Sequence, residues 1–186
     1  ETRYEYDDKG QVVTEKQKDS SGLERMKKIE YPYSKTPLGP LFKSMIERNM
    51  ISFPIRQRFY VDNKLTQEFS QEFDLFDGRI FTKSVTDIYP DGNKRIRYSN
   101  KYKNGYLIEQ SFGDGSTKSY LWNDNTANLM AVIDNISIES LKRIYPNSYV
   151  EFGLLTPSNS ALANQQELDF IRTKLIGDQH MVSYDY

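Results

Sequence analysis

Tight-turn signals divide the middle of this chain into segments that are rich in aromatic residues. Five such signals lie between Phe53 and Trp122, namely Asp62-Asn63, Asp77-Gly78, Asp91-Gly92, Asn104-Gly105 and Asp114-Gly115. Asp-Gly and Asn-Gly pairs readily adopt the positive φ angles that two-residue hairpin turns require. The segments between them are rich in Phe, Tyr, Val, Ile and Thr, which are favoured in strands. We therefore predict an antiparallel meander whose strands are joined by two-residue turns.

The predicted meander covers residues 51–134. After the first strand, which ends at Val61, further strands are expected at Leu65–Phe76, Arg79–Tyr89, Lys94–Lys103, Tyr106–Phe112, Thr117–Trp122 and Leu129–Asp134. Alternate residues of a strand point to opposite faces of its sheet. In the first strand this alternation places Phe59 on one face and Arg58 and Tyr60 on the other. The spacing of the turns predicts a broad, curved sheet of hairpins.

Hairpin strands are also predicted for residues 1–33, with turns at Lys9-Gly10 and Ser20-Ser21-Gly22. The segment Arg25–Tyr33 carries polar residues on both faces, which predicts an edge strand or a lightly covered sheet. Prolines and a glycine then interrupt the pattern. Residues 37–48 are expected to contain a short helix that starts at Leu41.

The last third of the chain is predicted to contain a helical segment over residues 137–177 and a terminal strand over residues 180–186. Ser137 is expected to cap a short helix that Pro146 ends, and residues 146–160 are expected to form a loop. A second helix is expected to begin at Asn164, with Glu167 three residues later as in a capping box.

The second of these helices carries an apolar stripe of Leu168, Ile171 and Leu175 and is expected to end at Gly177. Such a stripe has to be buried, so we expect two or three short helices to pack on one face or end of the sheet. The predicted fold class is therefore mainly β, or α+β.

The composition is consistent with a single folded domain over residues 1–186. A chain of this length buries about 70% of the surface that its unfolded form exposes. Its core is expected to depend on 14 tyrosines, 10 phenylalanines and one tryptophan, because only 37% of the residues are hydrophobic. The 25 basic and 26 acidic residues give a net charge of −1, which offers no field to attract nucleic acid.

Cysteine content and hydropathy exclude some kinds of protein but leave the compartment open. The chain has no cysteine, which excludes disulfides and thiolate nucleophiles but fits both a cytosolic protein and an exported bacterial one. No apolar run approaches the roughly 20 residues that a membrane-spanning helix needs. The sequence begins at Glu1 and not at Met, so we expect that its natural N-terminus has been removed, by signal cleavage or by trimming.

Tyrosine motifs stand near both ends of the chain. Tyr4-Glu5-Tyr6-Asp7-Asp8-Lys9-Gly10 resembles the Y-x-Y-D-x-x-G unit of the RHS/YD-repeat family, and Tyr184-Asp185-Tyr186 is similar to the opening of another unit. Tyr102-Lys103-Asn104-Gly105-Tyr106 is a degenerate relative of the same unit. The order of the later segments Met50–Ile55, Tyr120–Asp124 and Leu129–Ile133 is similar to that of a segment adjoining the repeats in YD-repeat surface proteins of Gram-negative gut-type bacteria.

This resemblance implies a chain built from strips of β-hairpins and located at the cell surface, in the periplasm or outside the cell. It also implies that this chain is part of a larger protein and that its partners are flanking repeats of the same polypeptide, a surface protein or a glycan. Catalytic pieces in the family lie in separate toxin modules, and none is recognisable here. In physical terms, the Asp of each unit can accept turn amides and the Gly can take the left-handed conformation.

No residue pattern identifies a reaction. Serine-hydrolase elbows, P-loops, dinucleotide fingerprints and HExxH motifs are absent from the sequence, and the single histidine, His180, has no partner motif. Acids on neighbouring predicted strands offer either a glycosidase pair or ordinary cross-strand charge pairs. These acids are Glu68, Glu72, Asp74, Asp87, Glu109 and Asp114. We therefore name no catalytic residue.

Two other patterns are better explained by local structure than by a ligand. Asn123-Asp124-Asn125 and Asp62-Asn63 carry oxygen ligands that suit calcium but lack the spacing of a calcium loop, so no metal or cofactor is expected. Lys94–Tyr98 and Lys101–Lys103 interleave basic and aromatic residues, as in proteins that bind single strands. With no net positive charge, an outward basic strand face explains them.

Aromatic side chains on neighbouring predicted strands offer a platform for stacking on sugar rings. The candidate ligand-binding residues are Tyr98, Tyr102, Tyr106, Tyr120 and Trp122. Core packing is the competing explanation for the same rings, because the chain has few aliphatic residues.

Three functions remain open on the sequence alone. The first is a non-enzymatic, exported module of a YD-repeat-like protein, used for scaffolding or surface interaction. The second is a carbohydrate-binding module with a Tyr/Trp platform, and the third is a carboxylate-dependent glycoside hydrolase.

Overall fold

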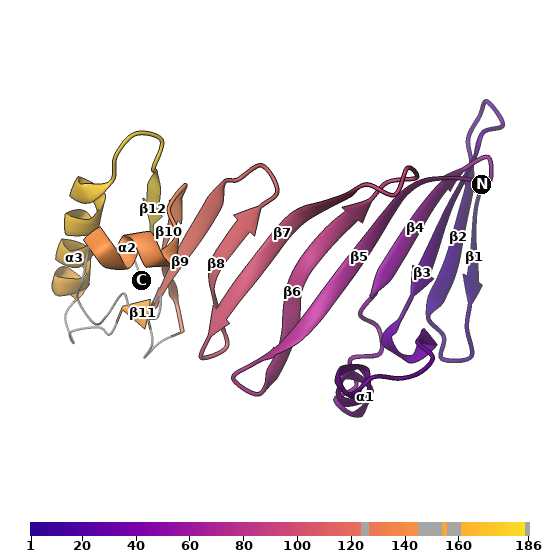
Figure 1. Ribbon diagram of the computed structural model, residues 1–186, viewed down its shortest axis with the longest axis horizontal. Coiled ribbons are helices and arrows are strands. Elements are labelled where there is room, and N and C mark those ends of the chain that lie inside the picture. The colour runs from indigo at the N-terminus through magenta and orange to yellow at the C-terminus, as the bar shows by residue number, and fades with distance from the viewer. Residues whose placement is uncertain (124–126, 145–153, 156–160, 185–186) are drawn as a thin grey trace. The chain divides into compact units, whose positions relative to one another are not determined.

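The computed structural model describes residues 1–123, 127–144, 154–155 and 161–184 of the chain (Figure 1). It is mainly β, with antiparallel strands and three short α-helices, which confirms the predicted fold class. The chain divides into two compact units. The first contains Glu1–Leu75 and Ile80–Arg97, and the second contains Phe76–Arg79 and Tyr98–Tyr186. Whether the 186 residues behave as one domain stays a prediction.

The first unit is an antiparallel meander in which each strand pairs with its neighbours along the chain. Its strands are β1 (Thr2–Tyr6), β2 (Val12–Lys18), β3 (Glu24–Glu30), β4 (Arg56–Val61), β5 (Lys64–Phe76), β6 (Arg79–Ile88) and the beginning of β7 (Lys94–Lys103). Strand β3 lies between β2 and β4, and β1 forms the edge (Figure 1). Of the two alternatives predicted for Arg25–Tyr33, an edge strand or a lightly covered sheet, the edge strand is therefore excluded. The polar residues there reflect a lightly covered sheet.

Helix α1 (Pro40–Glu47) and the short 3₁₀ helix η1 (Pro32–Ser34) lie in the connection between β3 and β4 (Figure 1). Pro40 follows the cap Gly39, which suits the first turn of a helix. At the other end, Asn49 takes a left-handed conformation and Met50 donates its backbone N–H to the Met45 carbonyl at 2.8 Å. This is a Schellman ending with asparagine in the usual glycine position.

Helix α1 covers a small apolar core in the first unit. The core consists of Met45, Ile55, Phe73 and Ile80, and Leu41, Phe42 and Met50 pack against it. Met45 and Met50, which are joined by the backbone hydrogen bond at the end of the helix, therefore also meet in this core. The predicted short helix is confirmed, one residue away from its expected bounds.

The first unit uses charge pairs across one face of β3, β4 and β5. Arg58 forms ion pairs with Glu30 at 2.7 Å and with Glu68 at 2.8 Å, and Arg56 forms an ion pair with Glu68 at 3.1 Å. Burial disfavours the charged form of Arg58, but its bond to Glu68 and the charges of both acids raise its pKa overall. We call this side the ion-pair face. The opposite side carries Phe59 and Phe69, and we call it the ring face.

The second unit continues the antiparallel order through the rest of β7, then β8 (Tyr106–Phe112), β9 (Thr117–Asn123), β10 (Leu129–Asp134) and β12 (Met181–Ser183). The short strand β11 (Leu154–Leu155) pairs in parallel with β9. Strands β7, β8 and β10 have the predicted bounds. Neither β11 nor η1 was predicted.

Helices α2 (Ile138–Ile144) and α3 (Ala161–Lys174) cover the larger apolar core of the second unit. Leu121 and Ile133 of the sheet meet Leu141, Leu168 and Ile171 of the helices there, and all five side chains are almost fully buried. The predicted apolar stripe and the cap Ser137, whose hydroxyl accepts the Ser140 N–H at 3.1 Å, are confirmed.

The predicted bounds of the second helix were wrong. Helix α3 begins at Ala161, three residues before the expected cap Asn164, and it ends at Lys174, before Gly177. Alanine and leucine precede the asparagine and are strong helix formers, so the helix extends past the capping signal. The predicted loop over residues 146–160 lies mostly outside the described residues.

The hairpin turns fall into two geometries where the sequence predicted one. At Asp62-Asn63, Asp77-Gly78 and Asn104-Gly105 both residues have positive φ, as in a two-residue type I′ turn. At Asp91-Gly92 and Asp114-Gly115 only the glycine has positive φ, and the turn contains three residues. The prediction of two-residue turns was wrong at these two sites because a preceding residue, Pro90 or Gly113, also belongs to the turn.

Candidate functional site

The five predicted platform residues lie on β7, β8 and β9 of the second unit, and each is half-buried. Cross-strand partners share a face. By register, Tyr98 pairs with Phe112, and Tyr120 pairs with Val132. Leu121 of the helix-covered core alternates with Tyr120 and Trp122 along β9, so these two rings lie on the other side of the sheet. We call this side the tyrosine face.

A chain of polar groups crosses the tyrosine face. The Tyr120 hydroxyl donates to Gln110 Oε1 at 3.4 Å, and Gln110 Nε2 donates to Asn100 Oδ1 at 3.0 Å. Asn100 Nδ2 then donates to the Tyr102 hydroxyl at 3.2 Å. Burial raises the pKa values of Tyr102 and Tyr120, so both hydroxyls keep their protons at neutral pH.

The structure brings only part of the predicted platform into ring contact. Tyr106 and Trp122 form a tilted pair with ring centroids 5.3 Å apart, whereas Tyr102 pairs with Phe76 at 4.9 Å. The Trp122 indole N–H donates to the Leu107 carbonyl at 2.7 Å, so this side chain offers a ligand its ring and not its donor. Ligand binding by these five residues stays a prediction.

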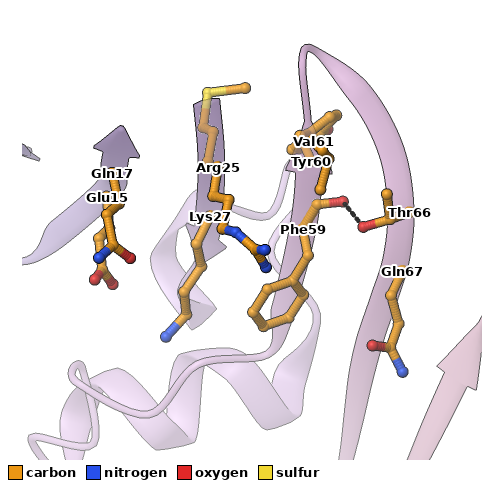
Figure 2. A pocket seen from close by; sticks show the side chains of 10 residues that line it. Glu15, Gln17, Arg25, Lys27, Phe59, Tyr60, Val61, Thr66 and Gln67 are labelled. Atoms are coloured by element: carbon orange, nitrogen blue, oxygen red, sulfur yellow. Dashed lines mark hydrogen bonds between the residues drawn. The ribbon is translucent and has the colours of Figure 1, made fainter. Parts of the chain in front are cut away.

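A shallow groove on the ring face of the first unit was not predicted from the sequence (Figure 2). It has a volume of about 400 Å³. Its lining comes from four neighbouring strands, with Glu15 and Gln17 on β2, Arg25 and Lys27 on β3, Phe59 and Val61 on β4, and Gln67 on β5. The groove has no sequence motif because its residues are brought together only by strand register.

An aromatic ring forms the centre of this groove. The Lys27 ammonium lies 5.9 Å from the centre of the Phe59 ring, and Phe59 meets Phe69 edge-on with centroids 5.1 Å apart. Further along the ring face, the Arg97 guanidinium lies 4.2 Å from the centre of the Phe69 ring and pairs with Asp87 at 3.0 Å. On this side of the sheet the two rings thus lie between two cations, Lys27 and Arg97.

Each of the acids considered for a glycosidase pair has a partner in the structure. Glu68 forms ion pairs with Arg56 and Arg58, Asp87 forms one with Arg97, and Glu109 forms one with Lys101 at 2.8 Å. Asp74 accepts the Leu75 backbone N–H and pairs with Lys83, which lowers its pKa. Glu72 accepts the Ser84 hydroxyl, and Asp114 accepts the Ser116 amide and hydroxyl. These contacts are the kind expected of cross-strand pairs and turn acceptors.

The remaining candidates from the sequence take local roles. The Asp62 carboxylate accepts a hydrogen bond from the Glu24 backbone N–H at 3.2 Å. His180 has an exposed side chain, and its backbone carbonyl accepts a hydrogen bond from the Asp134 N–H. In the Asn123-Asp124-Asn125 segment, residues 124 and 125 lie outside the described residues. Within the described ranges, no three His, Asp or Glu side chains gather closely enough to hold a metal ion. None of the described helices has the length and apolar character that a bilayer crossing requires.

Comparison with known proteins gives a distant structural likeness. No protein-family model matches the sequence, and no curated protein does so either. Among solved structures, the crystal structure of TcdB2-TccC3 aligns with 75% of this chain and 7% of its own chain, with 12% sequence identity and a TM-score of 0.39. The chain thus spans a small part of the protein that it matches, and a TM-score this low carries no argument about function.

Proposed function

We propose that this chain is a non-enzymatic, exported module of a YD-repeat-like surface protein. In this role it is a hairpin scaffold that pairs its edge strand with a neighbouring hairpin of the same polypeptide. The proposal is supported by the YD-type turn itself. Asp7 Oδ1 accepts the backbone N–H groups of Lys9 and Gln11 at 2.9 Å each, and Gly10 takes a left-handed φ of 72°. The same arrangement recurs at Asp19 and Gly22.

The observation that carries the proposal is the open edge at β1. This strand has β2 as its one neighbour in the strand order, and all five of its residues are exposed. Tyr4 and Tyr6 retain 50% and 62% of their accessible surface. A strand edge with unpaired backbone groups can pair with a further strand. The added strand would also cover the exposed Tyr4 and Tyr6 rings and so bury apolar surface.

The direction of the backbone groups identifies the residues that would bond a new strand. Lys18 N–H donates to the Glu1 carbonyl at 3.2 Å, and the Glu1 amino group reaches the Lys18 carbonyl at 3.5 Å. Such bonded pairs alternate in an antiparallel ladder with pairs whose backbone groups point outward. The N–H and C=O groups of Thr2 and Tyr4 therefore point to the open edge.

The test adds one hairpin to this edge. A copy of residues 1–22 fused before Glu1 supplies two strands and a turn that can place the second strand beside β1. We expect the amides of Thr2 and Tyr4 in the original β1 to exchange at least about tenfold more slowly in the tandem chain, because they gain hydrogen-bond partners. Amide hydrogen exchange followed by NMR measures this.

Two variants of the tandem chain separate edge pairing from unrelated stabilisation. Tyr4→Pro in the original strand removes the outward N–H but leaves the bonds to β2, so we expect the protection of Thr2 to disappear. Tyr4→Thr keeps the N–H and a strand-favouring side chain, so we expect protection to remain. Equal exchange of the Thr2 amide in the single and tandem chains would contradict the proposal.

Glycan binding on the tyrosine face is a second candidate, favoured by the polar chain from Tyr120 to Tyr102. Amide and hydroxyl groups beside half-buried rings are suited to a wet, polar ligand, and the Tyr106–Trp122 pair offers a stacking surface. On a glycan array we expect Trp122→Ala to weaken binding at least about tenfold. If the wild-type protein binds no glycan, or if both proteins bind equally, this candidate is removed.

A further inference from the structure

Two rows of side chains cross the groove on the ring face of the first unit. Strand register places Glu15 opposite Lys27, Lys27 opposite Phe59, and Phe59 opposite Gln67. The second row runs from Gln17 to Arg25 and then to Val61. Figure 2 shows the side chains of Glu15, Lys27, Phe59 and Gln67 extending to the same side of the sheet. The groove therefore presents an acid, two bases, two amides and a ring in a fixed order.

Among the described residues, no ion pair or side-chain hydrogen bond involves the charged groups of this groove. Glu15 and Lys27 are direct cross-strand neighbours of opposite charge, yet they form no ion pair, and the Lys27 ammonium lies near the Phe59 ring instead. Arg25 likewise makes no side-chain hydrogen bond or ion pair within the part of the chain that the structure describes. On the opposite, ion-pair face of β3 and β4, Glu30, Arg56 and Arg58 are all paired.

Glu15 and Arg25, which form no ion pair within the described ranges, and the neighbouring Lys27 are therefore available to a ligand. Two cations side by side on β3 suit a carboxylate, since guanidinium and ammonium groups form strong charge-assisted hydrogen bonds to one. The ring of Phe59 beside them suits an apolar surface. Glu15 accepts hydrogen bonds from hydroxyl groups but repels a second negative charge, and the amides of Gln17 and Gln67 both donate and accept.

We propose that this groove binds a sugar that carries a carboxylate group. The carboxylate lies on Arg25 and Lys27, the C–H face of the sugar ring lies on Phe59, and the hydroxyl groups bond Glu15 and the two glutamines. The volume of about 400 Å³ is within the range of small-ligand sites, about 300–1,000 Å³, and suits one or two sugar rings. A phosphate-rich ligand is disfavoured because the negative charge of Glu15 lies directly opposite Lys27.

The proposal does not rest on the proposed scaffold function, because its residues lie on β2 to β5 and none of them is on the open edge of β1. Uronic acids and sialic acids share the required chemistry. The probes are digalacturonate and sialyllactose, each with a neutral counterpart, the methyl ester of digalacturonate and lactose. The full chain is titrated with each probe, up to about 20 mM so that millimolar binding saturates, and amide shifts are followed by NMR.

We expect at least one acidic sugar to shift the amides of Lys27 and Phe59, and its neutral counterpart to shift them at least about tenfold more weakly. Arg25→Gln should weaken binding about tenfold or more, and since Arg25 is exposed the variant should keep the wild-type spectrum elsewhere. Lys28→Gln is the matched control. It removes the same charge from the same strand on the ion-pair face, and we expect less than a twofold effect.

Four results would overturn the inference. The first is no shift at the groove with either acidic sugar, and the second is an equal response to the neutral counterparts. The third is an equal loss of binding in Arg25→Gln and Lys28→Gln, which would mean attraction by overall charge. Tighter binding of N-acetyl-aspartate than of either sugar would also reject a sugar ligand in favour of an acidic peptide.

Discussion

At the scale of single residues, Asp7 connects the first turn to a distant part of the first unit. One carboxylate oxygen accepts hydrogen bonds from two backbone amides of its own turn, and the other accepts a hydrogen bond from the Tyr33 hydroxyl. The Tyr33 ring stacks on Tyr31 with centroids 5.7 Å apart, and the Tyr31 hydroxyl donates to the Val12 carbonyl at 3.0 Å. A turn residue of the YD-type unit thus also fixes the segment that follows β3.

The acidity of Asp7 provides a direct test of this connection. The hydrogen bond from Tyr33 is the main reason that the pKa of Asp7 lies below its ordinary value of 3.8. Its contribution to stability is therefore present above pH 3.8 and is lost as the pH falls through the lowered pKa. We expect Tyr33→Phe to raise the pKa of Asp7 toward 3.8, measured by NMR titration of its carboxyl carbon.

Asp19 is the matched control for that titration. It holds an equivalent turn, but Ser21 is the main group that lowers its pKa, and Tyr33 does not contact it. Its pKa should be the same in both proteins. A pKa of Asp7 that stays unchanged in Tyr33→Phe would mean that the turn amides alone stabilise the carboxylate.

Residue-scale features were predicted only where they depend on local sequence. The sequence predicted that Phe59 lies on the opposite face from Arg58 and Tyr60, because side chains alternate between faces along a strand. The groove was not predictable, because it requires Lys27 to lie opposite Phe59. This register depends on the connection of 25 residues between β3 and β4 (31 to 55), whose path the sequence pattern does not reveal. The same limit applies to Glu109, whose partners come from β7 and α2.

At the scale of elements, Glu109 joins strand β8 to helix α2. Its side chain is buried at 3% exposure, and one oxygen accepts the buried Ile138 N–H at 2.8 Å while the other bonds Lys101. Ile138 is the first residue of α2, where backbone N–H groups lack partners within the helix. The Glu109 carboxylate, which belongs to the sheet, thus accepts a hydrogen bond from a backbone N–H at the start of helix α2.

We expect Glu109→Ala to lower the free energy of unfolding by about 2–3 kcal/mol, because it leaves a buried backbone donor without an acceptor. Lys101→Met removes the counter-ion of Glu109 but leaves the Ile138 N–H its acceptor, so it should lower the free energy of unfolding less than Glu109→Ala does. Urea unfolding at neutral pH measures both. Equal losses in the two variants would assign the stability to the ion pair and not to the helix start.

The bounds of elements were predictable where a turn or a proline limits them on both sides. Strands β7 and β8 match their predicted bounds because the turn at Asn104-Gly105 lies between them. Helix α3 does not, because Ala161 and Leu162 continue the helix before the capping signal at Asn164. The short strand β11 has two residues, too few for a periodic pattern to reveal.

At the scale of the whole molecule, the two units differ in what holds them together. Among the described residues, nine buried apolar side chains form the main core of the second unit, Leu121 and Ile171 among them, whereas four form the core under α1. The first unit adds the ion pairs among Glu30, Arg56, Arg58 and Glu68 on one face. Charge pairs weaken with salt more than apolar contacts do, so the two units depend differently on solution conditions.

Neighbouring strands in the sheet are nearly all neighbours in the chain. Closing each new hairpin of this kind costs little loop entropy, so native contacts can form in the order in which the polypeptide emerges from a ribosome or a secretion pore. Among the described strands, the exceptions to this order come late in the chain, where β11 pairs with β9 and β12 pairs with β10. A chain with this arrangement can also gain or lose a pair of strands during evolution without disturbing the pairing of the others.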